Sequence, residues 1–168
     1  MDDQRRTLAL LRHAKSAYPE GIVDHERPLA PRGVRQARLA GDWLRANLPV
    51  IDHVLCSTAT RARQTLEYTG VDSPVHYSER LYGTTAATVI EEIHTVDDGV
   101  MTLLVVGHEP VISEVAVRLA GAGGTDTAAV ERISAKFPTS AIAVLRIGCS
   151  WERLEPGGAT LINFHVPR

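Results

Sequence analysis

The sequence predicts an α/β fold, a three-layer α/β/α sandwich around a mixed, mostly parallel sheet. Short apolar runs alternate with longer segments of helical periodicity, which is the pattern of strands joined by crossover helices. The runs at residues 8–11 and 101–106 are almost entirely apolar, as is typical of strands that are buried on both faces. The chain of 168 residues suits a single domain spanning 1–168, without internal repeat or linker.

The elements follow from these patterns in chain order. Strands are expected at residues 7–11, 53–56, 75–77, 101–106, 141–147 and 160–165, and the last two form an antiparallel pair. Helices are expected at residues 31–48, 61–68, 86–94 and 111–119.

The first strand is assigned at 7–11 because its apolar run is too short for a helix. The first helix starts at Pro31, which fits a first helical turn. Ala30 before it is a weak N-cap, costing about 1 kcal/mol relative to Ser or Thr. The inner-face candidates of this helix are Val34, Ala37, Leu39, Leu44 and Leu48.

The later helices have clear ends or clear faces. Gly70 stops the helix at 61–68, and Gly121 follows the helix at 111–119. The helix at 86–94 carries Val89, Ile90 and Ile93 on one side, which predicts a face buried against the sheet.

Composition excludes several classes of protein. The net charge of −2 argues against nucleic-acid binding, which needs a basic face, and no apolar run is long enough to span a membrane. The charged N-terminus is followed by an apolar run too short for a signal peptide, so a cytoplasmic location is expected. Cys56 and Cys149 are too far apart for a CxxC motif and are expected to be buried thiols.

Three strand ends carry residues that suit an anion site. Arg12 and His13 follow the first strand, a polar turn leading to Arg61 follows the second, and His108 follows the fourth. The carboxyl ends of parallel strands share one edge of the sheet, so these side chains are expected to converge. A cluster of guanidinium and imidazole groups favours phosphate as its ligand. Arg63 is expected to be solvated, and the remaining histidines to be structural or on the surface, namely His25, His53, His76, His94 and His165.

The chain resembles the histidine phosphatase superfamily, and within it the short SixA-like phosphohistidine phosphatases. The resemblance rests on motifs that span residues 10–141. They are Leu10-Leu11-Arg12-His13-Ala14-Lys15-Ser16, Arg27-Pro28-Leu29 with Arg32-Gly33, the Ser-x-x-x-Arg-Ala-x-Gln-Thr stretch at 57–65, Val106-Gly107-His108-Glu109-Pro110 and Pro138-Thr139-Ser140-Ala141. Two positions depart from the family pattern. Ala14 replaces the Gly of Arg-His-Gly, so its backbone must suit an L-residue, and Ala30 replaces a Ser or Thr cap.

The resemblance implies a phosphoglycerate mutase-like fold and a metal-independent phosphatase without cofactor. It implies that His13 attacks phosphorus and that Arg12, Arg61 and His108 contact the phosphoryl oxygens. Arg27 is a further candidate for contact with phosphate or substrate, with a salt bridge to Asp24 or Glu26 as the alternative. Glu79, in a segment that resembles the acid-bearing Glu-Arg-x-Tyr-Gly of phosphoglycerate mutases, is the expected general acid, with Asp24 and Glu109 as alternatives.

The expected substrate is a phosphohistidine-bearing protein, with a small phosphorylated metabolite such as a sugar phosphate or phosphoglycerate as the serious alternative. A phosphoglycerate mutase is disfavoured because residues 83–101 are too few for a substrate lid. A non-catalytic phosphopeptide-binding module would be expected to lack His13 or the acid. A cysteine phosphatase needs Cys-x5-Arg, and position 62, counted from Cys56, is alanine.

Overall fold

The computed structural model describes residues 5–121 and 123–168. Residues 1–4 lie outside the described residues. They belong to the charged N-terminus on which the expected cytoplasmic location partly depends. The six strands are β1 (Arg6–Arg12), β2 (His53–Ser57), β3 (Val75–Ser78), β4 (Thr102–Gly107), β5 (Ile142–Ile147) and β6 (Ala159–His165). The α-helices are α1 (Pro31–Asn47), α2 (Thr60–Thr69), α3 (Ala86–His94), α4 (Val111–Leu119) and α5 (Thr127–Ala135), and the 3-10 helices are η1 (Asp24–Glu26), η2 (Glu79–Leu81) and η3 (Trp151–Arg153).

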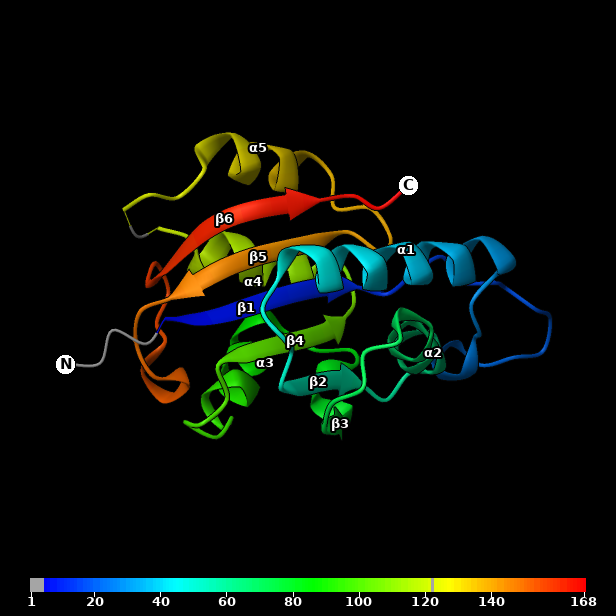
Figure 1. Cartoon of the computed structure of the whole chain (residues 1–168). Coiled ribbons are helices and arrows are strands. Elements are labelled where there is room, and N and C mark those ends of the chain that lie inside the picture. Colours follow the sequence, from blue (N-terminus) through cyan, green and yellow to red (C-terminus); the bar gives the residue numbers. More distant parts are fainter. Residues whose placement is uncertain (1–4, 122) are drawn as a thin grey trace.

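The strands form one mixed sheet in the order β3-β2-β4-β1-β5-β6. The pairs β1–β4, β2–β4 and β2–β3 are parallel, whereas β5 is antiparallel to both β1 and β6. The parallel strands point toward the same end of the molecule, at the right of Figure 1. The predicted α/β fold with its antiparallel closing pair is therefore confirmed.

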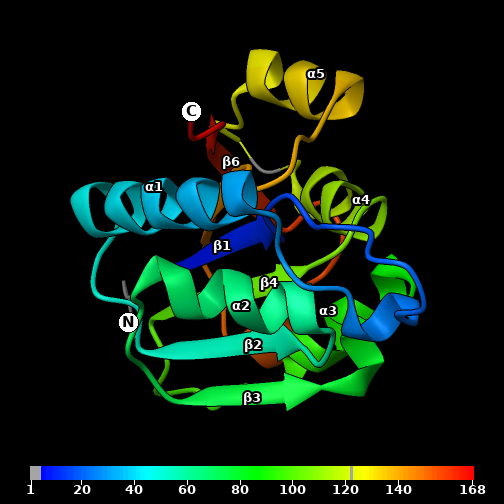
Figure 2. The same cartoon turned by 90° about the vertical axis from the view of Figure 1, so that its right-hand side faces the viewer.

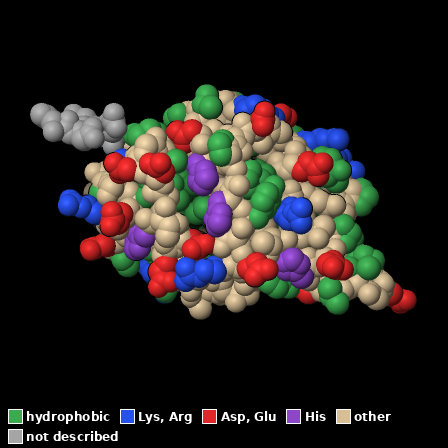
Figure 3. Space-filling view, turned by 90° about the horizontal axis from the view of Figure 1, so that it is seen from below, with side chains coloured by type: hydrophobic (Ala, Val, Ile, Leu, Met, Phe, Trp, Pro, Cys, Tyr) green, Lys and Arg blue, Asp and Glu red, His purple; other side chains and the backbone are tan. Residues whose placement is uncertain are grey.

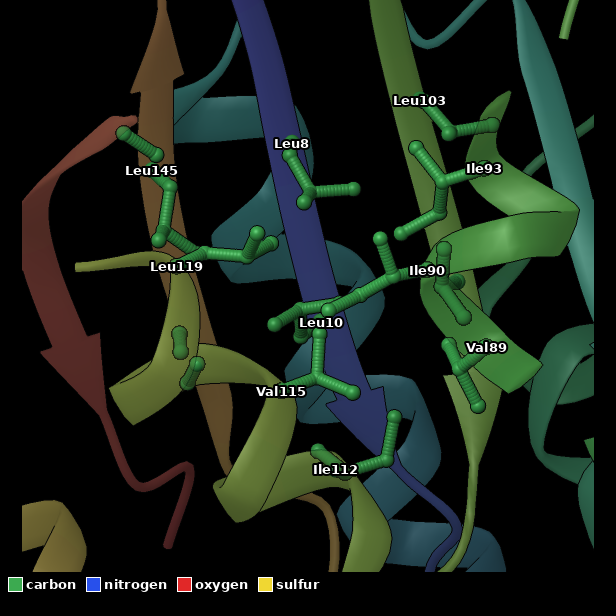
Figure 4. Packing of buried hydrophobic residues seen from close by; sticks show 14 of the residues in the cluster. Leu8, Leu10, Val89, Ile90, Ile93, Leu103, Ile112, Val115, Leu119 and Leu145 are labelled. Carbon is green, nitrogen blue, oxygen red and sulfur yellow. The ribbon is translucent and has the colours of Figure 1, made fainter. Parts of the chain in front are cut away.

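Two helical layers cover the sheet, with α1 and α2 on one face and α3 and α4 on the other (Figure 2). In strand β1, successive side chains point to opposite faces of the sheet and so contribute to the cores on both sides. Leu8 and Leu10 point into the cluster formed with α3 and α4 (Figure 4), while Ala9 and Leu11 pack with residues of α1 and α2. This double burial explains the continuous apolar run of the first predicted strand.

Helix α1 packs through small side chains. Its buried face is Gly33, Gln36, Ala37, Ala40, Gly41 and Leu44. Leu39 was expected on this face, but it is 42% exposed because the face repeats at positions 37, 40, 41 and 44, which leaves position 39 outside the stripe. A Cβ at Gly33 would collide with the carbonyl oxygen of Lys15, so glycine lets α1 lie against the loop after β1.

Helix α5 was not predicted from the sequence. It follows a glycine-rich stretch, and Asp126 caps it by accepting a hydrogen bond from the Ala129 amide at 3.1 Å. Its buried residues are Ala129 and Ile133, too few for a clear apolar periodicity. In the described part of the chain, no helix has the length and hydropathy needed to cross a membrane.

The contact between α1 and α2 gives a stability prediction. A Cβ at Gly41 would collide with the carbonyl oxygen of Thr69, the last residue of α2. Helix propensity alone favours alanine over glycine by about 0.5–1 kcal/mol. We expect the collision to dominate, so that Gly41→Ala lowers the free energy of unfolding by about 1–3 kcal/mol in urea titration.

The matched control is Gly148→Ala, where the added Cβ would meet no described heavy atom within 4 Å. This control should unfold like the parent chain. A Gly41→Ala variant as stable as the parent, or more so, would show that helix packing adapts without loss.

Candidate active site

The parallel pairing of β1 with β4 brings two distant sequence segments together. Arg12 pairs with Gly107 in the register, so His13 and His108 follow neighbouring strand ends. The amide of His13 donates a hydrogen bond to the carbonyl of Gly107 at 3.0 Å. The two imidazole rings lie with centroids 5.2 Å apart. The expected convergence of these residues at one sheet edge is therefore present in the structure.

The ring of His13 is held in one orientation. Its Nδ1 lies 2.7 Å from the carbonyl oxygen of Ala14, which can only accept, so Nδ1 carries the proton. In the neutral ring, Nε2 then holds the lone pair that a nucleophile needs. Ala14 has no positive φ, since Ser140 is the one non-glycine residue with positive φ in the described chain. The replacement of glycine at position 14 is thus compatible with the backbone, as predicted.

Both imidazoles are disfavoured as cations. The pKa of His13 is lowered to about 3, mainly because burial disfavours the charged ring. The hydrogen bond to the Ala14 carbonyl raises this pKa, whereas electrostatic interaction with His108, Arg61 and Arg12 lowers it. Burial likewise lowers the pKa of His108 to about 4, with Arg61 as the next cause. Both rings are therefore neutral near pH 7, which suits His13 for attack on phosphorus.

The motif at residues 57–65 shapes the second side of the site. Ser57 lies 2.8 Å from Nε2 of His108 and accepts from the Ala59 amide. Thr65 donates to the Arg61 carbonyl at 2.7 Å and accepts from the Ala14 amide at 2.9 Å. The threonine therefore fastens α2 to the residue that follows His13.

Arginine side chains enter the site from three segments. Arg12, at the end of β1, donates from Nη1 to the Phe137 carbonyl at 2.8 Å. Arg27, after η1, donates to Ser16 and to the Ala17 carbonyl. In the described chain, Nε of Arg12, Nε of Arg61 and Nδ1 of His108 are buried without a hydrogen-bond partner. The two arginine Nε–H groups are donors, and an unpaired buried donor is costly. A cluster of guanidinium groups of this kind favours an anion such as phosphate as its ligand.

Asp24 links two of these arginines. Its carboxylate accepts from Arg61 Nη2 and Arg27 Nε, both at 3.0 Å, and from the Tyr82 hydroxyl at 2.6 Å. Its carbonyl also accepts from Arg61 Nη1 at 2.7 Å. The hydrogen bond from Tyr82, with those from the arginines, holds the pKa of the Asp24 carboxyl below its usual range. A carboxylate held in this state orients the guanidinium groups and is a poor proton donor.

These side chains surround a polar surface cavity of about 230 Å³. It is lined by Arg12, His13, Lys15, Ser16, Tyr18, Arg27, Arg61, His108, Glu109 and Thr139. All the predicted site residues except Glu79 are therefore brought together in one cavity.

The two candidate acids lie in different places. Glu79 is exposed at the start of η2 and is not part of the cavity lining. Glu109 lines the cavity, but its carboxylate accepts hydrogen bonds from the amide and hydroxyl of Ser113, in the first turn of α4, at 2.7 and 2.8 Å. In this structure neither carboxyl faces the cavity as an unengaged acid.

Several cavity residues were not assigned a role from the sequence, namely Lys15, Ser16, Tyr18 and Thr139. Lys15 and Thr139 stood within recognised motifs but gave no separate signal, and Tyr18 lies in a polar loop without periodicity. Gln36 was also missed, although its Oε1 accepts from the Lys15 amide and the Thr139 hydroxyl, both at 3.0 Å. A buried glutamine amid an Arg-rich helix was the available signal.

A cysteine nucleophile does not fit the observed geometry. Cys56 is buried in the core between the sheet and α1 and α2, and it is absent from the cavity lining. Burial raises the pKa of its thiol to about 12, so the thiolate is disfavoured.

Comparisons with known proteins agree with this arrangement. The model of the histidine phosphatase superfamily (branch 1) matches residues 8–88. An uncharacterised protein of Mycobacterium tuberculosis strain H37Rv is 67% identical over 158 residues, covering 94% of this chain and 100% of that protein. A structure from Nakamurella multipartitia, provisionally described as phosphohistidine phosphatase SixA, has a TM-score of 0.88 at 37% identity, covering 97% of this chain and 96% of that one. The structure of the protein histidine phosphatase SixA complexed with tungstate has a TM-score of 0.77 at 26% identity, covering 96% of this chain and 97% of that one.

The low pKa values of the site histidines predict how stability depends on pH. An unfolded chain protonates each histidine near pH 6.5, whereas folded His13 and His108 do so only near pH 3 and 4. Between these limits the unfolded state binds more protons, so the free energy of unfolding falls as pH falls below 6.5. We expect His13→Asn to reduce this slope by up to about 1.4 kcal/mol per pH unit.

The measurement is urea unfolding at several pH values from 6.5 to 5, above the range where most carboxyl groups titrate. The difference between parent and variant isolates His13 from other histidines. Identical slopes in the two proteins would contradict a buried, neutral His13.

Proposed function

The chain belongs to the histidine phosphatase superfamily and is a phosphatase with a fold close to the SixA structures, and we propose that it hydrolyses phosphohistidine on proteins through a phosphorylated His13. The observation that carries the proposal is the fixed ring of His13. Its Nδ1–H is donated to the Ala14 carbonyl, and His13 lines a cavity together with the cationic side chains of Arg12, Arg27 and Arg61.

In the first step, Nε2 of His13 attacks phosphorus, and the bond between phosphorus and the leaving group breaks. The phosphoryl group moves to His13, and the negative charge on its oxygens is met by Arg12, Arg61 and His108. Preorganised donors stabilise this charge without reorganisation, and the link from Asp24 to Arg61 and Arg27 supplies that preorganisation. In the second step, the oxygen of water attacks phosphorus and the bond between phosphorus and Nε2 of His13 breaks. The electron pair of that bond returns to Nε2, so His13 is again a neutral imidazole, and phosphate leaves with the oxygen and both hydrogens of the water.

The preference for phosphohistidine rests on the leaving group. An alkoxide is a poor leaving group and needs a proton from a general acid. The imidazole of phosphohistidine leaves as a neutral ring when its other nitrogen carries a proton. Asp24 is held as a carboxylate, Glu109 is engaged by Ser113, and Glu79 is exposed outside the cavity. A site with this arrangement of carboxyl groups suits the substrate that needs least protonation.

Trapping the intermediate tests the role of His13. The protein is mixed briefly with radiolabelled phosphohistidine substrate, quenched in base, and the label is mapped by peptide analysis. We expect a base-stable, acid-labile label on His13, because a phosphorus–nitrogen bond has these properties. His13→Ala should lose the label and at least about 10³-fold in kcat.

The control is His76→Ala, which removes an exposed histidine of β3 that does not line the cavity and should label fully. Label on Ser57, on Cys56 or on His108 alone would refute the assignment, as would an active His13→Ala variant.

A paired substitution tests the general acid. For an alkyl phosphate ester, whose alkoxide is a poor leaving group, we expect Glu79→Gln to lower kcat by about 10²–10⁴-fold, the range for loss of proton transfer. For phosphohistidine the same variant should keep its rate, because that leaving group needs less protonation. The hydrogen bond between a general acid and the leaving group often forms only after the substrate has bound. The exposed position of Glu79 in the absence of substrate is therefore compatible with this role.

Glu109→Gln is measured in parallel with both substrates. A loss of ester hydrolysis in this variant, with none in Glu79→Gln, would move the acid role to Glu109. If the parent, Glu79→Gln and Glu109→Gln hydrolyse the ester at equal rates, neither carboxyl is the general acid, and water donates the proton.

A further inference from the structure

The loop of residues 18–23 projects beside the cavity, and we call it the projecting loop. It carries exposed hydrophobic side chains, Tyr18, Ile22 and Val23, at 73%, 43% and 64% of full exposure. Of the eight large hydrophobic residues exposed among the described positions, three therefore fall within six consecutive residues. Figure 1 shows the loop in blue at the far right, the end to which the parallel strands point.

The projecting loop is firmly held at both ends. Ser16 forms an antiparallel bridge with Leu29, and the Ala17 amide donates to the Pro28 carbonyl at 2.8 Å. On the far side, Asp24 is tied to α2 through Arg61 and to the chain after η2 through Tyr82. The loop therefore presents its apolar side chains in a fixed place, where binding would lose little conformational entropy.

The loop is continuous with the catalytic cavity. Tyr18 lines the cavity, and its ring packs against the Arg27 guanidinium at 4.1 Å from the ring centroid. Ile22 and Val23 lie beyond the cavity lining, next in sequence to Asp24. Figure 3 shows this end of the molecule as a projection at the lower right, with green hydrophobic and red acidic side chains on its surface.

The size of the cavity limits what binds inside it. A volume of about 230 Å³ is below the roughly 300–1,000 Å³ of pockets that enclose a drug-sized ligand. A phosphoryl group and the ring that carries it fill such a space. The rest of a large substrate must lie outside, against the rim of the cavity and the adjoining loop.

We propose that the projecting loop is a docking surface for the folded protein that carries the phosphohistidine. The side chains of Ile22 and Val23 become buried against the surface of that protein. This inference rests on the proposed function. Exposed apolar side chains grouped beside a functional site mark interaction surfaces. A protein partner fits because it brings both the phosphoryl group for the cavity and an apolar surface for the loop.

The test compares two substrates with the same leaving group. One is a small folded protein phosphorylated on a single exposed histidine with phosphoramidate, and the other is free phosphohistidine. We expect the double variant Ile22→Ser/Val23→Ser to lower kcat/KM for the protein by about tenfold, mainly through KM. Hydrolysis of free phosphohistidine should be unchanged, because neither residue lines the cavity.

The matched control is Val50→Ser, which removes a side chain that is 88% exposed in the connection between α1 and β2, at the opposite end of the sheet. It should leave both substrates unaffected. Circular dichroism and thermal unfolding are used to check that the double variant is folded.

Other outcomes overturn the inference in separable ways. If the double variant hydrolyses the protein substrate at the parent rate, or loses the same factor on both substrates, the loop has no docking role. The proposed phosphatase function of the parent chain would still stand. A change of oligomeric state in the double variant, seen by light scattering, would assign the loop to self-association. A parent enzyme that hydrolyses neither form of phosphohistidine would refute the proposed function itself.

Discussion

The register between β1 and β4 is the constraint on which the site depends. Parallel pairing of Arg12 with Gly107 places His13 and His108 next to one another at the carboxyl edge of the sheet. A shift of one residue would turn every β1 side chain to the opposite face and would exchange Leu8 and Leu10 for Ala9 and Leu11 in the two cores. Because both faces are buried by different residues, the core fixes the register, and through it the distance between the two imidazoles.

The second requirement is to hold several cations together. Arg12, Arg27 and Arg61 repel one another, and a single carboxylate, Asp24, bonds two of them while its carbonyl also binds Arg61. Arg12 is held separately by a backbone carbonyl. Each arginine is thus anchored through part of its guanidinium group, and the buried Nε atoms of Arg12 and Arg61 have no hydrogen-bond partner in the described chain. Each of these hydrogen bonds has at least one charged partner, and such hydrogen bonds are stronger than those between neutral groups.

The sequence predicted those parts of the fold that local patterns determine. The helices 86–94 and 111–119 and the strand ends carrying Arg12, Arg61 and His108 could be read because periodicity and chain order fix them. Leu39 was misplaced because small residues, Ala40 and Gly41, form the true face of α1, and a hydrophobicity pattern underweights them. Helix α5 escaped because its stability comes from a cap and two buried side chains. The ties of Asp24 to Arg61 and Tyr82 join residues 37 and 58 positions apart, and no local pattern encodes such distances.

The same contact network connects chemistry to substrate selection. Asp24 follows the projecting loop and accepts hydrogen bonds from the guanidinium of Arg61, so the loop and an arginine of the cavity are parts of one hydrogen-bonded unit. Tyr82 extends this unit to His108, since its ring lies 5.6 Å from that imidazole between centroids. Under the proposed function, a cavity of about 230 Å³ holds the phosphoryl group and its ring, and it therefore contributes little selectivity among protein substrates. If the substrate is the proposed phosphohistidine protein, selectivity for one protein over another comes from surfaces outside the cavity. The projecting loop is such a surface, and Asp24 fixes its position relative to Arg61 of the cavity.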